Sequence, residues 1–243
     1  APGGRIELSV PKGLPAGAEN IAHKAAQRFF EETGAWNPGV RIRIRKRIPV
    51  SAGLGGGSAD AAAVILALDR LLGTELAPGG LLHIGEAIGA DVPFCMTGGT
   101  MLAEGTGSIL TPLPELPDCR IVLAKPGQKP STARMYALYD QSGRKSAADI
   151  RALADAVCAG ELSGVARNLG NAFLEFWNDE KTLAAIRTLT EYGALGASLS
   201  GSGPSVFGIF EDKQDAEKCA AALRGACGEV YVCRPQNAGC EWA

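Results

Sequence analysis

The chain has 243 residues, of which 46% are hydrophobic and 21% charged, and its formal net charge is −2. That length supports one large domain or two medium ones, and the near-neutral charge gives no reason to expect a nucleic-acid or membrane partner. The longest uninterrupted apolar run, Ala61–Leu68, is too short to span a bilayer. Because no basic-then-apolar signal segment opens the sequence, we expect a cytoplasmic protein.

The cysteines indicate the redox environment. There are seven, without a disulfide-framework spacing: Cys95, Cys119, Cys158, Cys219, Cys227, Cys233 and Cys240. An odd number without such spacing predicts reduced thiols. The last four crowd the C-terminus, but they form no C-x-x-C pair and have no nearby histidine, so we expect no zinc site there.

The N-terminal half alternates strand and helix patterns. The predicted elements are a strand over 5–10, helices over 18–34, 60–72 and 78–89, a strand over 40–48 and a hairpin over 100–113. In "VRIRIRKRI" at 40–48, arginines alternate with apolar residues. They form either a stripe that binds nucleic acid or the solvated face of a sheet, and we favour the solvated sheet face.

The proline-rich, acidic stretch "LPELPDC" at 113–119 predicts a seam between domains. After it we expect a strand from residue 120 and helices over 147–158, 161–176 and 179–192. A strand–turn–strand unit over 196–210, a helix over 213–226 and a strand over 229–235 follow. No internal repeat is visible, and the many hairpin signals favour an α+β fold in two domains.

A glycine-rich loop precedes the helix predicted at 60–72. Four of the five residues at 53–57 are glycine, although glycine costs roughly 0.5–1 kcal/mol against alanine in regular structure. The loop is neither a Walker A motif, since no Lys-Ser/Thr follows, nor a G-x-G-x-x-G fingerprint. A glycine loop that opens a helix suits an anion such as phosphate, and the alternative is a tight strand-to-helix connection without a ligand.

Two further stretches contain candidate residues for catalysis or for anion binding. Asp91 in "IGADVPFC" is either a cap of the next helical turn or a carboxylate that orients or deprotonates a substrate hydroxyl. The stretch "SGSGPS" at 200–205 is either a second anion-binding turn or an ordinary β-hairpin loop.

Together, "IPVSAGLGGGSADAA", "IGADVPFC" and "SLSGSGPSVFGIF" resemble the GHMP small-molecule kinases. "GGTMLAEGTG" and "KPGQKPSTARMYALYD" narrow the resemblance to the branch that phosphorylates the 2-hydroxyl of 4-diphosphocytidyl-2-C-methyl-D-erythritol in the non-mevalonate isoprenoid pathway. It implies ATP and Mg²⁺ as cofactors and a small-molecule substrate. It also implies a ribosomal-protein-S5-like N-terminal domain (1–117), a ferredoxin-like C-terminal domain (118–236) with the site between them, and a tail (237–243).

The resemblance also implies roles for individual residues. Asp91 matches the catalytic aspartate, Asn20 an asparagine near the adenine, and Lys46 a basic residue on the same side. Thr132 matches a substrate-side threonine, and Ser58 would neighbour Mg²⁺. Gly201, Ser202 and Gly203 would close against the phosphates. The ATP loop would comprise Pro49, Val50, Ser51, Ala52, Gly53, Leu54, Gly55, Gly56, Gly57, Ser58 and Ala59.

The sequence also departs from the family. The family opens with a strand carrying Pro-Ala-Lys and a Gly-Tyr-His segment, and this sequence contains neither. We expect either an N-terminally truncated form or a member without its first strands. Two other functions therefore stay open: a GHMP kinase for a different small alcohol, and a catalytically inactive nucleotide-binding form.

Overall fold

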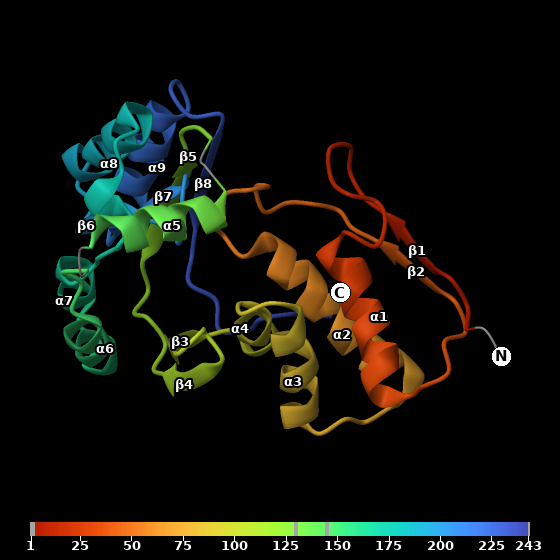
Figure 1. Cartoon of the computed structure of the whole chain (residues 1–243). Helices are drawn as coiled ribbons and strands as arrows, with labels where there is room; N and C mark the ends of the chain where they lie inside the picture. The colour runs from red at the N-terminus through yellow and green to blue at the C-terminus, as the bar shows by residue number, and fades with distance from the viewer. Residues whose placement is uncertain (1–2, 129–130, 144–145, 243) are drawn as a thin grey trace. The chain divides into compact units, whose positions relative to one another are not determined.

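The computed structural model describes residues 3–128, 131–143 and 146–242. The chain divides into two compact units, the first comprising 1–50, 55–112 and 237–243, and the second 51–54 and 113–236. The glycine-rich loop therefore changes unit twice, because its residues 51–54 belong to the second unit. Figure 1 shows the elements of both units.

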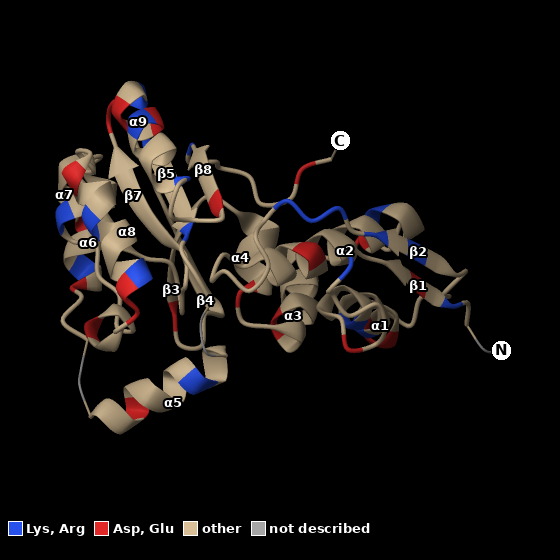
Figure 2. Cartoon of the chain, turned by 90° about the horizontal axis from the view of Figure 1, so that it is seen from above, with Lys and Arg blue, Asp and Glu red and all other residues tan. Residues whose placement is uncertain are grey.

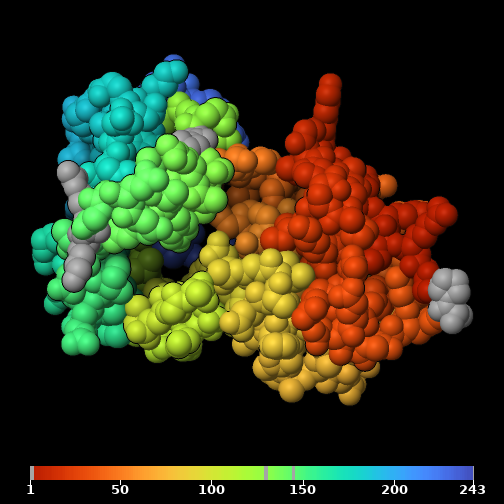
Figure 3. All heavy atoms as spheres, in the orientation of Figure 1, coloured from red at the N-terminus to blue at the C-terminus, as the bar shows by residue number. Residues whose placement is uncertain are grey.

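The first unit is built around two helices. Its elements are β1 (Ile6–Ser9), α1 (Ile21–Thr33), β2 (Val40–Arg43), α2 (Gly56–Leu72), α3 (Pro78–Ile88), α4 (Val92–Thr97), β3 (Thr100–Glu104) and β4 (Ile109–Leu113), whose last residue lies in the second unit. The core between α1 and α2 contains several buried alanines, together with Phe29 and Ile65. In the space-filling view, α1 and α3 form one continuous surface (Figure 3).

The strands β1 and β2 form a two-stranded parallel sheet, with Ile6 opposite Val40 and Ser9 opposite Arg43. Their half-buried apolar residues alternate with exposed ones, so one face of this sheet packs on the helices and the other is wet.

The second unit has a four-stranded antiparallel sheet in the order β6-β7-β5-β8. Its elements are β5 (Arg120–Lys125), α5 (Thr132–Ser142), α6 (Ile150–Cys158), α7 (Leu162–Arg167), the 3₁₀ turn η1 (Leu174–Phe176), α8 (Glu180–Glu191), β6 (Gly196–Leu199), β7 (Val206–Phe210), α9 (Lys213–Leu223) and β8 (Glu229–Cys233). Val122 packs in the core with α8 and α9, and its neighbour Ile121 packs with α6 and α7. Both faces of the sheet are therefore covered by helices.

Most predicted elements are confirmed, and the errors have local causes. The strand predicted over 40–48 ends at Arg43, because hydrogen bonding to β1 stops where Ile44 N–H donates to Ser9 O. The helix predicted over 161–176 breaks after Arg167, where the Asn168 side chain turns back to Gly164 O. The helices α4 and α5 were not expected, since α4 has six residues and α5 buries only one side chain, Met135.

Two further observations concern the cysteines and the hydropathy of the helices. All seven cysteines lie in the described ranges, and each is a free thiol. None of the helices in those ranges combines the length and the hydropathy that crossing a bilayer needs.

Candidate active site

The glycine-rich loop leads directly into helix α2. The helix begins at Gly56 rather than at residue 60 as predicted, so half of the glycine run is helical. Gly55 is its N-cap in the left-handed region, with φ of 62°, and no side chain caps the helix. The first helical hydrogen bond runs from Ala59 N–H to Gly55 O at 2.9 Å. The amide groups before Ala59 therefore have no helical acceptor and suit an anion.

Gly53 is required by the packing of the second unit. Its φ is 72°, and a Cβ there would lie 2.4 Å from Ser200 O and 2.8 Å from Gly203 O. The Ser200 hydroxyl donates to Gly53 O at 2.9 Å, and Ser205 N–H donates to Ala52 O at 3.3 Å. The loop residues 51–54 are thus bound to the turn at 200–205.

Gly56 and Gly57 differ in what surrounds them. A Cβ on Gly56 would lie 2.9 Å from Ile48 Cγ2 and 3.1 Å from Lys46 Nζ, so this glycine is required by close packing. A Cβ on Gly57 would meet only Ile21 Cγ2, at an ordinary 3.5 Å. Close packing within the chain therefore requires a glycine at position 56. It does not require one at position 57, where a Cβ would fit.

Lys46 lies at the first turn of α2. Its ammonium group donates to Gly56 O and to the Asp60 carboxylate, and the two side chains are only 11% and 22% exposed. This ion pair fixes Lys46 beside the open amide groups of the helix. Asp60 was not among the predicted site residues, although an acidic side chain in the second turn after a glycine run is a signal for such a pair.

Asp91 occupies the N-cap position of α4, but its side chain does not cap the helix. The residue is exposed, and its carboxylate forms no capping hydrogen bond and no ion pair with another described residue. The interpretation of Asp91 as a helix cap is therefore wrong, and its oxygens are free to accept a proton or a hydrogen bond from a substrate.

The thiol of Cys95 shows that Asp91 and Lys46 share one electrostatic environment. Burial, together with the charges of Asp91 and Cys240, raises the pKa of Cys95 to about 11, and the charge of Lys46 opposes this rise. Cys95 lies one turn after Asp91, and its Sγ is 3.9 Å from Gly55 O. The first unit thus gathers a carboxylate, an ammonium group and a helix N-terminus.

Asn20 is the N-cap residue of α1, a structural role that its resemblance to the family's asparagine did not indicate. It is buried and caps α1: its Oδ1 accepts from Ala22 N–H at 2.9 Å, and its Nδ2 donates to Pro15 O at 2.7 Å. Both the oxygen and the nitrogen of the side-chain amide therefore form hydrogen bonds within the chain. A position beside the adenine stays a prediction.

The second unit places the remaining predicted residues around the turn at 200–205. Gly201 and Gly203 have φ of 52° and 72°, and the Gly203–Pro204 peptide is cis. The hydroxyls of Ser202 and Thr132 lie 3.1 Å apart, so Thr132 at the start of α5 contacts this turn.

Asn171 supports the same turn and was missed in the sequence. Its Nδ2 donates to Leu199 O at 2.9 Å and to Gly201 O at 2.8 Å. Its Oδ1 accepts from Phe173 N–H at 2.9 Å. Asparagine after the Leu-Gly pair at 169–170 is a turn signal, but nothing local indicates a partner 28 or 30 positions away.

The donor set fits a polyphosphate better than a metal held by protein alone. Residues 55–58 present uncapped amide groups at a helix N-terminus, and in the described part of the chain no group of three acidic, histidine or cysteine side chains is placed to hold a metal ion. Mg²⁺ commonly keeps few protein ligands and binds through substrate phosphates, so the residues are compatible with magnesium carried by a nucleotide.

Two family models match this chain. Residues 20–99 match the family model "GHMP kinases N terminal domain", and residues 153–229 match "GHMP kinases C terminal". The chain is 39% identical over 239 residues to the 4-diphosphocytidyl-2-C-methyl-D-erythritol kinase of Pelotomaculum thermopropionicum, covering 96% of this chain and 82% of that one. It is 42% identical over 235 residues to the enzyme of the same name from Acetivibrio thermocellus, with the same two coverages.

Solved structures show the same fold. A crystal structure of 4-(cytidine 5'-diphospho)-2C-methyl-D-erythritol kinase superposes with a TM-score of 0.73 at 32% identity, covering 95% of this chain and 81% of that one. A homoserine kinase from Cytophaga hutchinsonii has a TM-score of 0.78 at 23% identity, covering 98% and 84%, which shows the fold alone. The expected GHMP kinase fold is confirmed. The chain belongs to the GHMP kinase family and, within it, to the 4-diphosphocytidyl-2-C-methyl-D-erythritol kinases.

Proposed function

We propose that this chain transfers the γ-phosphoryl group of ATP to the 2-hydroxyl of 4-diphosphocytidyl-2-C-methyl-D-erythritol, a step of the non-mevalonate pathway to isoprenoid precursors. Relatives about 40% identical over nearly the whole chain carry the name of that kinase. We further propose that it works in the cytoplasm, since seven free thiols suit a reducing compartment.

The observation that carries the proposal is the free carboxylate of Asp91 in the same unit as Lys46 and the open N-terminus of α2. Phosphoryl transfer asks the protein mainly for positioning and for stabilisation of negative charge. Asp91 accepts the proton of the substrate hydroxyl, whose oxygen forms the new bond to the γ-phosphorus while the bond to the ADP oxygen breaks. Lys46 and the helix amides stabilise the charge on the phosphate oxygens.

The nucleotide is assigned to the loop Pro49–Ala59. The uncapped amides at residues 56–58 hold phosphate oxygens, and the bare Gly57 lets them approach the backbone. Mg²⁺, when bound with ATP, would neutralise phosphate charge, and Ser58 is its proposed neighbour in the protein. Gly201–Gly203 is assigned to the phosphate side and Thr132 to the substrate side, because a serine between the two glycines contacts Thr132.

A substrate panel tests the proposal. Purified chain with Mg²⁺-ATP is given 4-diphosphocytidyl-2-C-methyl-D-erythritol, homoserine or mevalonate, and ADP release and the phosphorylated product are measured. We expect release with the first compound only. Release with another alcohol would make the chain a GHMP kinase of different specificity. ATP binding without release from any compound would favour the catalytically inactive form.

A further inference from the structure

The tail, of which the structure describes residues 237–242, follows β8 of the second unit but belongs to the first unit. Figure 1 shows it in blue, passing close to α4. The Cys240 side chain packs against the core of the first unit together with Cys95 of α4. Trp242 reaches α2, where the guanidinium group of Arg70 lies over its ring, 4.3 Å from the centroid. The tail therefore contacts two helices of the first unit.

The tail crosses the end of α4 with backbone against backbone. A Cβ on Gly98, the C-cap residue of α4, would lie 2.0 Å from Gly239 N. A Cβ on Gly239 would lie 2.4 Å from Cys95 O and 2.9 Å from Met96 O. Gly239 has no positive φ, so its backbone conformation alone would accept a side chain. The crossing is therefore what requires a glycine at position 239.

The C-terminal end of α4 lacks partners within the helix. The helix has only six residues, and the last carbonyl groups of any helix have no helical donor. The Cys240 thiol donates to the carbonyl oxygen of Cys95 at 3.5 Å. Helix α4 contains no charged side chain and is tan throughout in Figure 2, so ion pairs from its own residues do not hold it. The tail therefore supplies contacts that so short a helix cannot make by itself.

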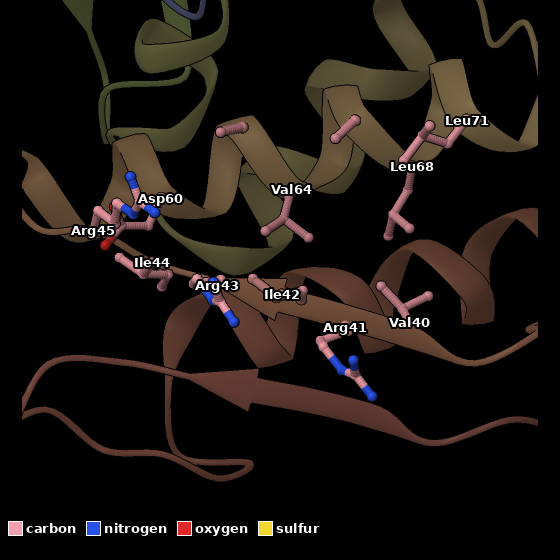
Figure 4. Close-up of a pocket in the computed structure, with 12 residues that line it drawn as sticks. Val40, Arg41, Ile42, Arg43, Ile44, Arg45, Asp60, Val64, Leu68 and Leu71 are labelled. Carbon is pink, nitrogen blue, oxygen red and sulfur yellow. The ribbon is translucent and has the colours of Figure 1, made fainter. Parts of the chain in front are cut away.

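Helix α2 holds the far end of the tail. Val64 and Leu68 of α2 point toward β2 (Figure 4), so this face of the helix is turned to the sheet. Arg70 does not line that face, and it is the residue that Trp242 contacts. The N-terminus of the same helix is the proposed phosphate site. The tail thus links α4 to the helix whose first turn is assigned to ATP.

Asp91 is connected to the tail through Cys95. The Cys95 N–H donates to Asp91 O at 3.1 Å, and the Cys95 carbonyl group contacts the tail. The Asp91 carboxylate is exposed and makes no capping bond. Its location is therefore set by the backbone of α4 rather than by a capping bond of its own side chain.

We propose that the tail positions Asp91 for phosphoryl transfer, with Gly239 and Cys240 as the positioning residues. By holding the C-terminal end of α4, the tail keeps the helix, and with it the carboxylate at the other end, in one place. The inference rests on the proposed function, in which Asp91 accepts the proton of the substrate hydroxyl. A displacement of about 1 Å in such a group can cost roughly a hundredfold in rate.

Gly239→Ala is the variant that tests this role, because its methyl group meets Cys95 O without a change of charge. We expect kcat toward 4-diphosphocytidyl-2-C-methyl-D-erythritol to fall about tenfold or more, while the dissociation constant of ATP stays within about twofold. Hydrogen exchange of the α4 amides should become faster. Gly228→Ala is the matched control: nothing lies within 4 Å of a Cβ at this exposed glycine, and its kinetics and exchange should equal those of the wild type.

The same substitution in the Asp91→Asn background separates positioning from general support of the fold. Gly239→Ala should lower the residual rate of that variant by less than about twofold, since no carboxylate remains to be misplaced. An equal loss in both backgrounds would show that the tail only stabilises the fold and would overturn the proposal. Cys240→Ala removes the thiol at Cys95 O without a clash and repeats the comparison should Gly239→Ala fail to fold.

The outcomes distinguish the positioning role from the proposed function. A wild-type chain that releases no ADP with the substrate would overturn both. Wild-type activity that Gly239→Ala and Cys240→Ala both retain would overturn the positioning role alone, and so would hydrogen exchange in α4 that neither substitution changes.

Discussion

The hydroxyl of Ser200 donates a hydrogen bond of 2.9 Å to the carbonyl oxygen of Gly53, 147 positions earlier in the sequence. This bond fixes the middle of the glycine-rich loop to the turn at 200–205. The glycines of this loop are therefore not all present for the same reason. Gly53 and Gly56 are required by contacts within the chain, and Gly57 is not.

The different tasks of the glycines give a first prediction. Gly53→Ala places a Cβ 2.4 Å from Ser200 O at a φ of 72°, so the free energy of unfolding should fall by about 1–3 kcal/mol. Gly57→Ala meets no close atom and should leave stability unchanged or raise it by up to about 1 kcal/mol. Its affinity for ATP should nevertheless fall, because the methyl group occupies the approach to the helix amides.

Urea unfolding and ATP titration of the two variants check this prediction. Loss of stability in Gly57→Ala equal to that in Gly53→Ala would mean that position 57 is packed after all. Unchanged ATP affinity in Gly57→Ala would place the phosphates elsewhere.

The ion pair between Lys46 and Asp60 gives a second prediction. The side chains are 11% and 22% exposed, so removing one partner leaves a largely buried charge. Lys46→Met and Asp60→Ala should each lower the free energy of unfolding by about 1–3 kcal/mol, and the double variant should lose less than the sum. Lys46→Met should also raise the KM for ATP. Chemical denaturation of the four proteins in the cycle measures the coupling, and strictly additive losses would show that the pair does not act as one unit.

The third prediction concerns the thiol of Cys95, whose pKa is raised to about 11 by burial and by the charges of Asp91 and Cys240. Only the thiolate reacts with iodoacetamide. With that pKa, roughly one Cys95 in a thousand is thiolate at pH 8, so alkylation should be slow. Asp91→Asn removes a charge that raises the pKa and should speed the reaction. Lys46→Met removes one that lowers it and should slow the reaction further.

Peptide mapping by mass spectrometry follows Cys95 separately from the exposed Cys158, which serves as the internal control. Equal alkylation rates of Cys95 in the wild type and both variants would show that Asp91 and Lys46 do not act on this thiol. The readout is independent of kinase activity.

Local sequence patterns predicted the elements whose cause is local. The alternation in 5–10 and the apolar spacing of 18–34 predicted β1 and α1, since each pattern buries one face of its element. The start of α2 was misplaced because glycine disfavours helix locally, whereas here Gly56 packs against Ile48 and Lys46.

The same difference between local and distant causes applies to the residues of the candidate site. Asp91 was predicted because a short motif surrounds it; its side chain does not cap α4, and its catalytic role stays a prediction. The hydrogen bonds of Asn171 to the turn were not predicted, because its partners Leu199 and Gly201 are distant in sequence. Motifs thus indicate the groups that face a ligand more readily than the side chains that hold those groups in place.

The central claim is that Asp91 performs chemistry rather than supporting the fold. Because its exposed carboxylate makes no capping bond, Asp91→Asn should change the free energy of unfolding by less than about 0.5 kcal/mol and leave ATP binding intact.

The most direct measurement is ADP release by the purified 243-residue chain and by its Asp91→Asn variant, with and without 4-diphosphocytidyl-2-C-methyl-D-erythritol. The wild type should release ADP only with the substrate, and the variant should lose roughly a hundredfold or more of that rate. Substrate-dependent release that survives in Asp91→Asn would contradict the assignment of Asp91 as the catalytic carboxylate.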